Sequence, residues 1–186
     1  MKVFYFLLFF VGILLFFKKR IQTCSVPVTW LNARLAHVPK SQETDVHVGQ
    51  PGRRSTPLRS QDFTDVYDHL ESLLGRRVVR EIPIEHRVYD TGSCGMDWHA
   101  DVRVLPGDYS EVVLTLRNDS DSVFEYKTLG GWLTRRIVPT EGTVVFVRPE
   151  DVVHRVTPVS HGSREILKFV VVPTGVISDT HYDALG

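Results

Sequence analysis

Residues 142–172 read GTVVFVRPEDVVHRVTPVSHGSREILKFVVV, and this stretch decides the fold. Three short β-type runs, GTVVFV, VVHRVTPV and REILKFVVV, are separated by the turn sequences RPED and SHGS. The stretch therefore predicts three consecutive β-strands.

The same pattern extends back to residue 77. Turn sequences such as DTGSCG, LPGDYS, NDSDS and PTEG separate further short β-type runs, which are VVREIPI, HRVY, WHADVRVL, EVVLTLR, SVFEY and WLTRRIV. Many short strands at this spacing are typical of an antiparallel sandwich or barrel. We predict one mainly β domain of the jelly-roll type over residues 61–186, without an internal repeat.

Two segments before residue 77 differ from this pattern. Residues 62–77 carry apolar side chains from Phe63 to Leu74 at helical spacing, and Gly75 follows as a stop signal, so a helix is expected to flank the sheet. Residues 21–60 contain four prolines and keep no period of 2 or 3.6 residues. We interpret them as a linker with a short ordered piece around VTWLNARLA.

The first 20 residues are predicted to be a membrane anchor. Residues 3–17 carry no charge, and as a helix they cover about 23 Å of the ~30 Å hydrocarbon layer, which flanking lysines can extend. No small residues follow to mark signal-peptide cleavage, so an uncleaved single-pass transmembrane helix is expected. Basic residues on its C-terminal flank favour a cytoplasmic domain. A lumenal domain stays open as the alternative.

Charge and cysteine content exclude some classes of protein. The chain has 22 basic and 22 acidic residues, and the first 20 residues hold four basic ones and no acidic one, so the remaining 166 carry a formal net charge of −4. Such a body is not expected to bind nucleic acid, which usually selects a basic surface. Cys24 and Cys94 form no CxxC pair, so neither a disulfide framework nor a cysteine zinc site is predicted.

The run WHADVRVL places His99 and Asp101 two residues apart. Side chains at i and i+2 of a strand point to the same face, so both can converge on one metal ion. The pair alone is a weak signal, because a chain of this composition contains it by chance about once in two cases. His154, on a later predicted strand, adds a second imidazole. Two imidazoles and one carboxylate suit Fe(II) with open coordination positions.

Arg164 and Tyr89 are candidate ligand-binding residues. Arg164 lies in an apolar run ten residues beyond His154, where an unpaired cation is costly. Its guanidinium matches a carboxylate through two parallel hydrogen bonds. Tyr89, ten residues before His99, can offer a hydroxyl to the same ligand. His86 and His161, by contrast, are expected to be solvated.

Together these residues resemble a known family. Tyr89, HAD at 99–101, GTVVFV at 142–147, His154, TPV at 157–159 and GSREIL at 162–167 are similar to the Fe(II)/2-oxoglutarate-dependent dioxygenase superfamily, and most to its prolyl-hydroxylase-like branch. The resemblance covers about residues 77–173 and implies a double-stranded β-helix, which is a distorted jelly roll.

The resemblance also implies roles for individual residues. His99, Asp101 and His154 are implied to be the catalytic iron ligands, Arg164 to bind the far carboxylate of 2-oxoglutarate, and Tyr89 to assist. Ascorbate is a further cofactor that the family allows. The sequence departs from the family pattern at residues 120–126, where SDSVFEY replaces the usual GGET.F hairpin and leaves Phe124 as an expected core residue.

These implications predict a membrane-anchored dioxygenase that hydroxylates a protein or peptide side chain, prolyl or lysyl, with release of succinate and CO2. The same chemistry on a small molecule, a lipid or a nucleobase is the alternative enzyme hypothesis. A non-catalytic jelly-roll binding module is the alternative outside enzymes. The sequence does not reveal the oligomeric state.

Overall fold

The structure, a computed structural model, describes residues 21–40, 52–128 and 131–174. Most of its elements are strands. In chain order the elements are β1 (Ile21–Ser25), α2 (Thr29–Leu35), β2 (Arg53–Leu58), α3 (Thr64–Leu74), β3 (Arg77–Val78), β4 (Ile84–Tyr89), β5 (Met96–His99), β6 (Ser110–Asn118), β7 (Phe124–Thr128), β8 (Leu133–Ile137), β9 (Thr143–Val147), β10 (His154–Val156) and β11 (Arg164–Val172).

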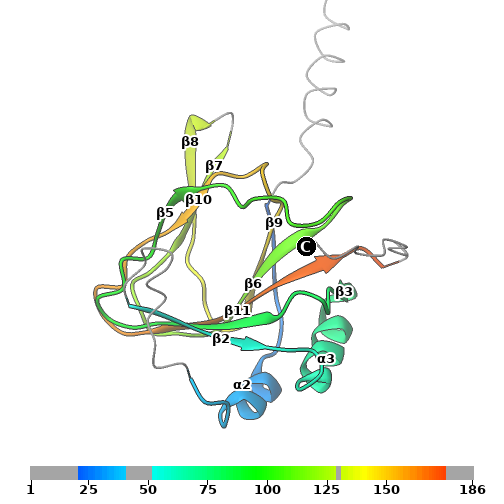
Figure 1. The fold of residues 1–186 in the computed structure, drawn as a ribbon. Helices are drawn as coiled ribbons and strands as arrows, with labels where there is room; N and C mark the ends of the chain where they lie inside the picture. Colours follow the sequence, from blue (N-terminus) through cyan, green and yellow to red (C-terminus); the bar gives the residue numbers. More distant parts are fainter. Residues whose placement is uncertain (1–20, 41–51, 129–130, 175–186) are drawn as a thin grey trace, which may run out of the picture.

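The strands form two antiparallel sheets that face each other (Figure 1). The larger sheet has the order β1-β9-β6-β11-β4-β2, with β3 also paired to β11, and the smaller has the order β5-β10-β7-β8. From β4 onward the chain crosses repeatedly from one sheet to the other, which is the winding of a jelly roll. The predicted mainly β, jelly-roll architecture is therefore confirmed.

The two helices cover the outside of the larger sheet (Figure 1). Leu31 of α2 and Leu70 of α3 belong to one buried apolar cluster that also includes Leu167 of β11. The predicted helix over residues 62–77 is confirmed as α3, which ends where Gly75 takes a left-handed conformation (φ 59°) and donates its N–H to the Glu71 carbonyl. Left-handed caps of this kind favour glycine.

A second, smaller apolar cluster lies between the two sheets. It joins Phe124 of β7 to Val145 and Val147 of β9 and to Val156 of β10. Phe124 is a buried core residue, as its place in SDSVFEY predicted. Since the larger sheet has apolar neighbours on both sides, its central strands read as nearly continuous hydrophobic runs.

The predicted linker over residues 21–60 needs correction. β1 pairs with β9, β2 pairs with β4, and α2 packs into the outer apolar cluster, so much of this segment belongs to the folded domain. Both strands lie at the edges of the larger sheet, where side chains need not alternate between apolar and polar. An edge position also tolerates Pro57, which cannot donate a backbone hydrogen bond.

The predicted membrane anchor lies outside the described residues. In residues 21–40, 52–128 and 131–174, neither helix has the length and apolar character needed to cross a membrane.

Candidate metal centre

Two neighbouring strands of the smaller sheet bring His99 and His154 together. His99 is the last residue of β5, His154 is the first of β10, and the two are directly paired across the strands. Their ring centroids lie 4.4 Å apart. Directly paired residues point to the same side of a sheet. Both imidazoles line a cavity together with residues of the larger sheet, so they face the space between the sheets.

Asp101 joins them from just beyond the end of β5. The sequence predicted a strand through residues 98–105, but β5 ends at His99 and the chain then leaves the sheet. The Asp101 backbone is held by a hydrogen bond from the Glu150 N–H to its carbonyl, 3.0 Å long. His99 and Asp101 therefore converge as predicted. They do not do so as neighbours on one strand, because β5 ends before Asp101.

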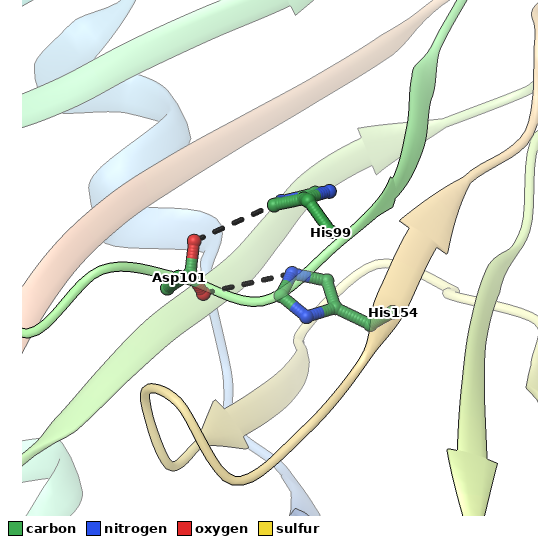
Figure 2. Close-up of side chains that lie close together, drawn as sticks. All are labelled: His99, Asp101 and His154. Atoms are coloured by element: carbon green, nitrogen blue, oxygen red, sulfur yellow. Dashed lines mark ion pairs between the residues drawn. The ribbon is translucent and has the colours of Figure 1, made fainter. Parts of the chain in front are cut away.

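The three side chains form one compact group (Figure 2). The carboxylate of Asp101 faces both rings from one side, with its Oδ1 3.8 Å from His99 Nε2 and its Oδ2 3.6 Å from His154 Nε2. Their potential ligand atoms all lie within 4.8 Å of one another. His154 and Asp101 are nearly buried, whereas 28% of the His99 side chain is exposed, so solvent approaches the group past His99.

Hydrogen bonds that the rings donate to backbone carbonyls orient both imidazoles. His99 Nδ1 lies 2.7 Å from the Asp97 carbonyl, and His154 Nδ1 lies 3.1 Å from the Val152 carbonyl. A carbonyl can only accept, so in each ring Nδ1 carries the proton and Nε2 keeps its lone pair for a metal. Burial lowers the pKa of His154, which favours the neutral, ligating form. His99 Nε2 is buried and has no hydrogen-bond partner among the described residues.

This donor set fits a ferrous ion. Two neutral imidazoles and one carboxylate on one side of an ion leave several coordination positions open, a combination suited to non-haem Fe(II). Bringing these groups together without any ion would leave a buried nitrogen lone pair unsatisfied, which is unfavourable. The chemistry of the donors and the unpaired His99 nitrogen therefore agree with a metal site.

Arg164 and Tyr89 lie together on the larger sheet, facing the same cavity. Arg164 begins β11, Tyr89 ends β4, and the two are directly paired. The cavity that they line is also lined by His99, Asp101 and His154. The structure thus brings all five predicted site residues to one chamber between the sheets.

The Arg164 guanidinium is buried without a partner. The residue is only 1% exposed, and none of its three guanidinium nitrogens has a hydrogen-bond partner in the described part of the chain. Burial lowers the pKa of Arg164, and the neighbouring Tyr89 opposes that shift. An unpaired buried cation is costly, and a carboxylate bound to two guanidinium nitrogens would remove most of that cost.

The sequence interpretation missed three charged residues in the same chamber. Lys168 Nζ lies 2.6 Å from Glu111 Oε2 and 3.4 Å from Asp101 Oδ1, and Arg87 also lines the cavity. Burial raises the pKa of Glu111. Burial alone would lower the pKa of Lys168, but the Glu111 and Asp101 carboxylates outweigh it and raise that pKa. A lysine four residues after Arg164 in an apolar run, on the same strand face, was the signal available in the sequence.

One sequence prediction about a histidine is wrong. His86 is buried and its Nε2 lies 2.7 Å from Glu165 Oε1 on the helix-covered side of the larger sheet. His161, in contrast, is exposed as expected, with 71% of its side chain accessible.

No protein-family model and no curated protein matches this chain. Solved structures do share its fold. A Pseudomonas putida prolyl-4-hydroxylase is similar with a TM-score of 0.59 at 13% identity, over 85% of this chain and 95% of the other.

Two other solved structures are similar at the same level. HygX from Streptomyces hygroscopicus, with nickel, 2-oxoglutarate and hygromycin B bound, has a TM-score of 0.57 at 13% identity, over 88% of this chain and 86% of its own. A Trichoplax adhaerens prolyl hydroxylase, in complex with a peptide fragment of the hypoxia-inducible factor oxygen degradation domain, has a TM-score of 0.57 at 12% identity. The match covers 83% of this chain and 84% of the other. At such low identities the likeness shows the fold alone, and it confirms the predicted one.

Proposed function

We propose that this chain is an Fe(II)- and 2-oxoglutarate-dependent dioxygenase. The observation that carries the proposal is the unpaired, buried guanidinium of Arg164 in the same chamber as the His99, Asp101 and His154 group. A metal site alone would not need a buried arginine. A metal site that also binds a dicarboxylic acid would need one, because the second carboxylate must be neutralised inside the protein.

Each residue then has a defined task. His99, Asp101 and His154 would hold Fe(II), leaving positions for the keto acid end of 2-oxoglutarate and for dioxygen. Arg164 would bind the far carboxylate through paired N–H donors, and the Tyr89 hydroxyl would donate a further hydrogen bond to it. When bound, iron and 2-oxoglutarate supply the activation of dioxygen, which the protein's own side chains cannot provide.

The overall reaction balances as follows. Substrate C–H, dioxygen and 2-oxoglutarate give substrate C–OH, succinate and CO2, with one oxygen atom entering each organic product. The chain's contribution is orientation and exclusion of water. Phe124 packs against the His154 ring at 5.1 Å between centroids, and Val147 and Val156 complete an apolar wall of the chamber.

For the substrate we propose a prolyl or lysyl side chain of a protein or peptide. The support is that two proteins of the same fold are prolyl hydroxylases, one of them in complex with a peptide. A small-molecule substrate is the second candidate, because HygX has the same fold and a structure of it holds hygromycin B.

We also propose that residues 1–20 anchor the domain to a membrane as a single transmembrane helix, with the domain on the cytoplasmic side. The support is the uncharged run of residues 3–17 and the basic residues that follow it. Asn118-Asp119-Ser120 fits the acceptor sequence for N-glycosylation. Enzymatic deglycosylation of the expressed chain tests the side, because a mobility shift would show that Asn118 is glycosylated and that the domain is in the lumen instead.

The enzyme proposal is tested with the full chain in detergent. We expect Fe(II) and 2-oxoglutarate to bind and to give slow release of succinate and CO2 without any added substrate. His154→Ala should abolish this turnover, whereas His161→Ala, at an exposed turn, should leave it unchanged. A wild-type chain that binds neither the metal nor 2-oxoglutarate would overturn the proposal and favour a non-catalytic module.

The substrate proposal is tested in cells. Protein extracts from cells that express the wild type should contain a prolyl or lysyl peptide that gains the mass of one oxygen atom, and cells that express His154→Ala should lack it. If only a small molecule or lipid gains oxygen, the peptide proposal is wrong and the enzyme proposal stands.

A further inference from the structure

One row of side chains crosses the smaller sheet on the side that faces the chamber. His99 pairs with His154, His154 pairs with Tyr126, and Tyr126 pairs with Arg135, so the row runs through β5, β10, β7 and β8. Directly paired residues share a face. The row therefore places a phenol and a guanidinium beside the two imidazoles of the metal centre.

Packing confirms which face this is. Tyr126 of β7 and Ile137 of β8 pack against the apolar cluster between the sheets. Tyr126 lies two residues after Phe124, and Ile137 lies two residues after Arg135. Side chains alternate along a strand, so Arg135 lies on the same side as Ile137, one step nearer the end of the hairpin. Figure 1 shows the β7–β8 hairpin projecting beyond the ends of β5 and β10. Arg135 thus lies on the same face of the smaller sheet as the two imidazoles, two strands away from His154.

Arg135 differs from its neighbour Arg136. Arg136 lies on the opposite face and donates two hydrogen bonds to Glu125 Oε1, 3.2 and 3.0 Å long. Arg135 is exposed, and its side chain makes no hydrogen bond or ion pair with any residue in the described part of the chain. The hairpin therefore holds one arginine in an ion pair on its outer side and leaves the other available on its cavity side.

We propose that Arg135, assisted by the Tyr126 hydroxyl, binds a carboxylate of the substrate, so that the enzyme acts on an acidic peptide. This inference rests on the proposed function. A guanidinium is the side chain best matched to a carboxylate, and an exposed cation on the face of the sheet that carries the candidate metal ligands attracts anionic ligands.

The row also sets a spacing. Arg135 is two strands away from His154, which corresponds to about 10 Å between their backbones. An extended peptide rises roughly 3.3 Å per residue, so 10 Å spans about three residues. The substrate should therefore carry an aspartate or glutamate about three positions from the residue that is hydroxylated.

The test is a binding measurement with the full chain loaded with Fe(II) and 2-oxoglutarate in the absence of oxygen. The probes are fluorescein-labelled peptides with a central proline and one glutamate placed one to five residues away, plus a peptide with glutamine instead. We expect the tightest binding with glutamate at about the third position. Arg135→Gln should weaken that binding about tenfold, as for the loss of a charge-assisted hydrogen bond.

Arg136→Gln is the matched control, because it removes the same charge from the outer face one residue away. It should change the affinity by less than about twofold, since an exposed charge on the far face contributes little. A further probe carries lysine in place of glutamate. Arg135→Glu should reverse the preference and bind this lysine peptide more tightly than the glutamate peptide.

Three results would overturn the inference: no difference between glutamate and glutamine peptides, equal losses for the two arginine variants, or no reversal with Arg135→Glu. Failure of the proposed function is a separate observation, because the wild type would then not bind Fe(II) or 2-oxoglutarate before any peptide is added.

Discussion

The two faces of the larger sheet differ most clearly along β11, although the same strand builds both. Along β11, Leu167, Phe169 and Val171 point toward the helices and join the outer apolar cluster. The alternate residues Arg164 and Lys168 point into the chamber with the metal centre. The helix-covered face stabilises the fold by burying apolar surface, whereas the chamber face carries buried charges that cost stability and serve the site.

Variants on the two faces of the larger sheet should therefore differ in whether they reduce function or stability. Variants of the charged residues on the chamber side should impair ligand binding and leave the free energy of unfolding unchanged or raised. Variants on the helix side should do the reverse.

The largest expected effect is the loss of turnover in His154→Ala. Removing one of the three proposed metal donors should abolish the proposed succinate release, while the thermal midpoint of the metal-free protein stays near that of the wild type. A midpoint that falls by several degrees would show that His154 also stabilises the fold and would blur the separation of the faces.

Leu167→Ala tests the opposite face. Leu167 is fully buried against the helices, so the truncation should lower the free energy of unfolding by about 2–5 kcal/mol. Urea unfolding followed by circular dichroism measures this. The folded fraction should bind 2-oxoglutarate with the wild-type affinity, and a loss of affinity would contradict the independence of the two faces.

Arg164→Met should weaken 2-oxoglutarate binding roughly 10- to 100-fold, because a charge-assisted contact to the far carboxylate is lost. The free energy of unfolding should not fall, since the variant removes a buried cation that has no partner among the described residues. Calorimetric titration and urea unfolding are the two measurements. Arg155→Met, on the outer side of β10 where Arg155 bonds Glu125, is the matched control and should keep 2-oxoglutarate affinity.

A pH dependence is expected on the helix side of β11. The hydrogen bond from His86, with help from Lys40, lowers the pKa of Glu165 to about 2 against the opposing effect of burial. Because the folded-state pKa lies below the unfolded value, the stabilisation is complete above about pH 4.5 and is lost as the pH falls toward 2.

Glu165→Gln should remove this part of the acid sensitivity, on the order of 2 kcal/mol, from a series of urea titrations between pH 2 and 6. An unchanged pH profile would show that the Glu165 contact contributes nothing to acid stability.

The smallest expected effect is that of Tyr89→Phe. Deleting one hydroxyl beside Arg164 should weaken 2-oxoglutarate binding about fivefold, which corresponds to about 1 kcal/mol for one hydrogen bond. Calorimetric titration in parallel with Arg164→Met ranks the two. If Tyr89→Phe were the weaker binder of the two, the assignment of Arg164 as the main anchor would be wrong.

Much of the fold was predictable because its signals are local. Turn sequences between short β-type runs predicted the strands from residue 77 onward, and the spacing from Phe63 to Leu74 predicted α3. β1 and β2 were missed because edge strands depend on a partner elsewhere in the chain for their hydrogen bonds, and nothing local requires them to alternate.

The candidate site was partly predictable for a similar reason. His99, Asp101 and His154 were predicted as metal ligands because their side chains are typical donors and because they lie in or beside predicted strands. Lys168 and Glu111 were missed because they matter as an ion pair with each other. They are 57 residues apart in sequence, and their charged atoms are 2.6 Å apart in the structure. His86 was misjudged because burial of a histidine is set by Glu165 on a different strand.

The strands after residue 77 and the residue types that can hold a metal were predictable from the sequence, because strand alternation, turn chemistry and ligand chemistry are properties of a residue and its near neighbours. Only the tertiary structure decided that β10 lies between β5 and β7, and hence that imidazoles, a phenol and a guanidinium stand in one row. Strand order depends on how all the elements bury their surfaces against one another, so it cannot be predicted from any single stretch of sequence.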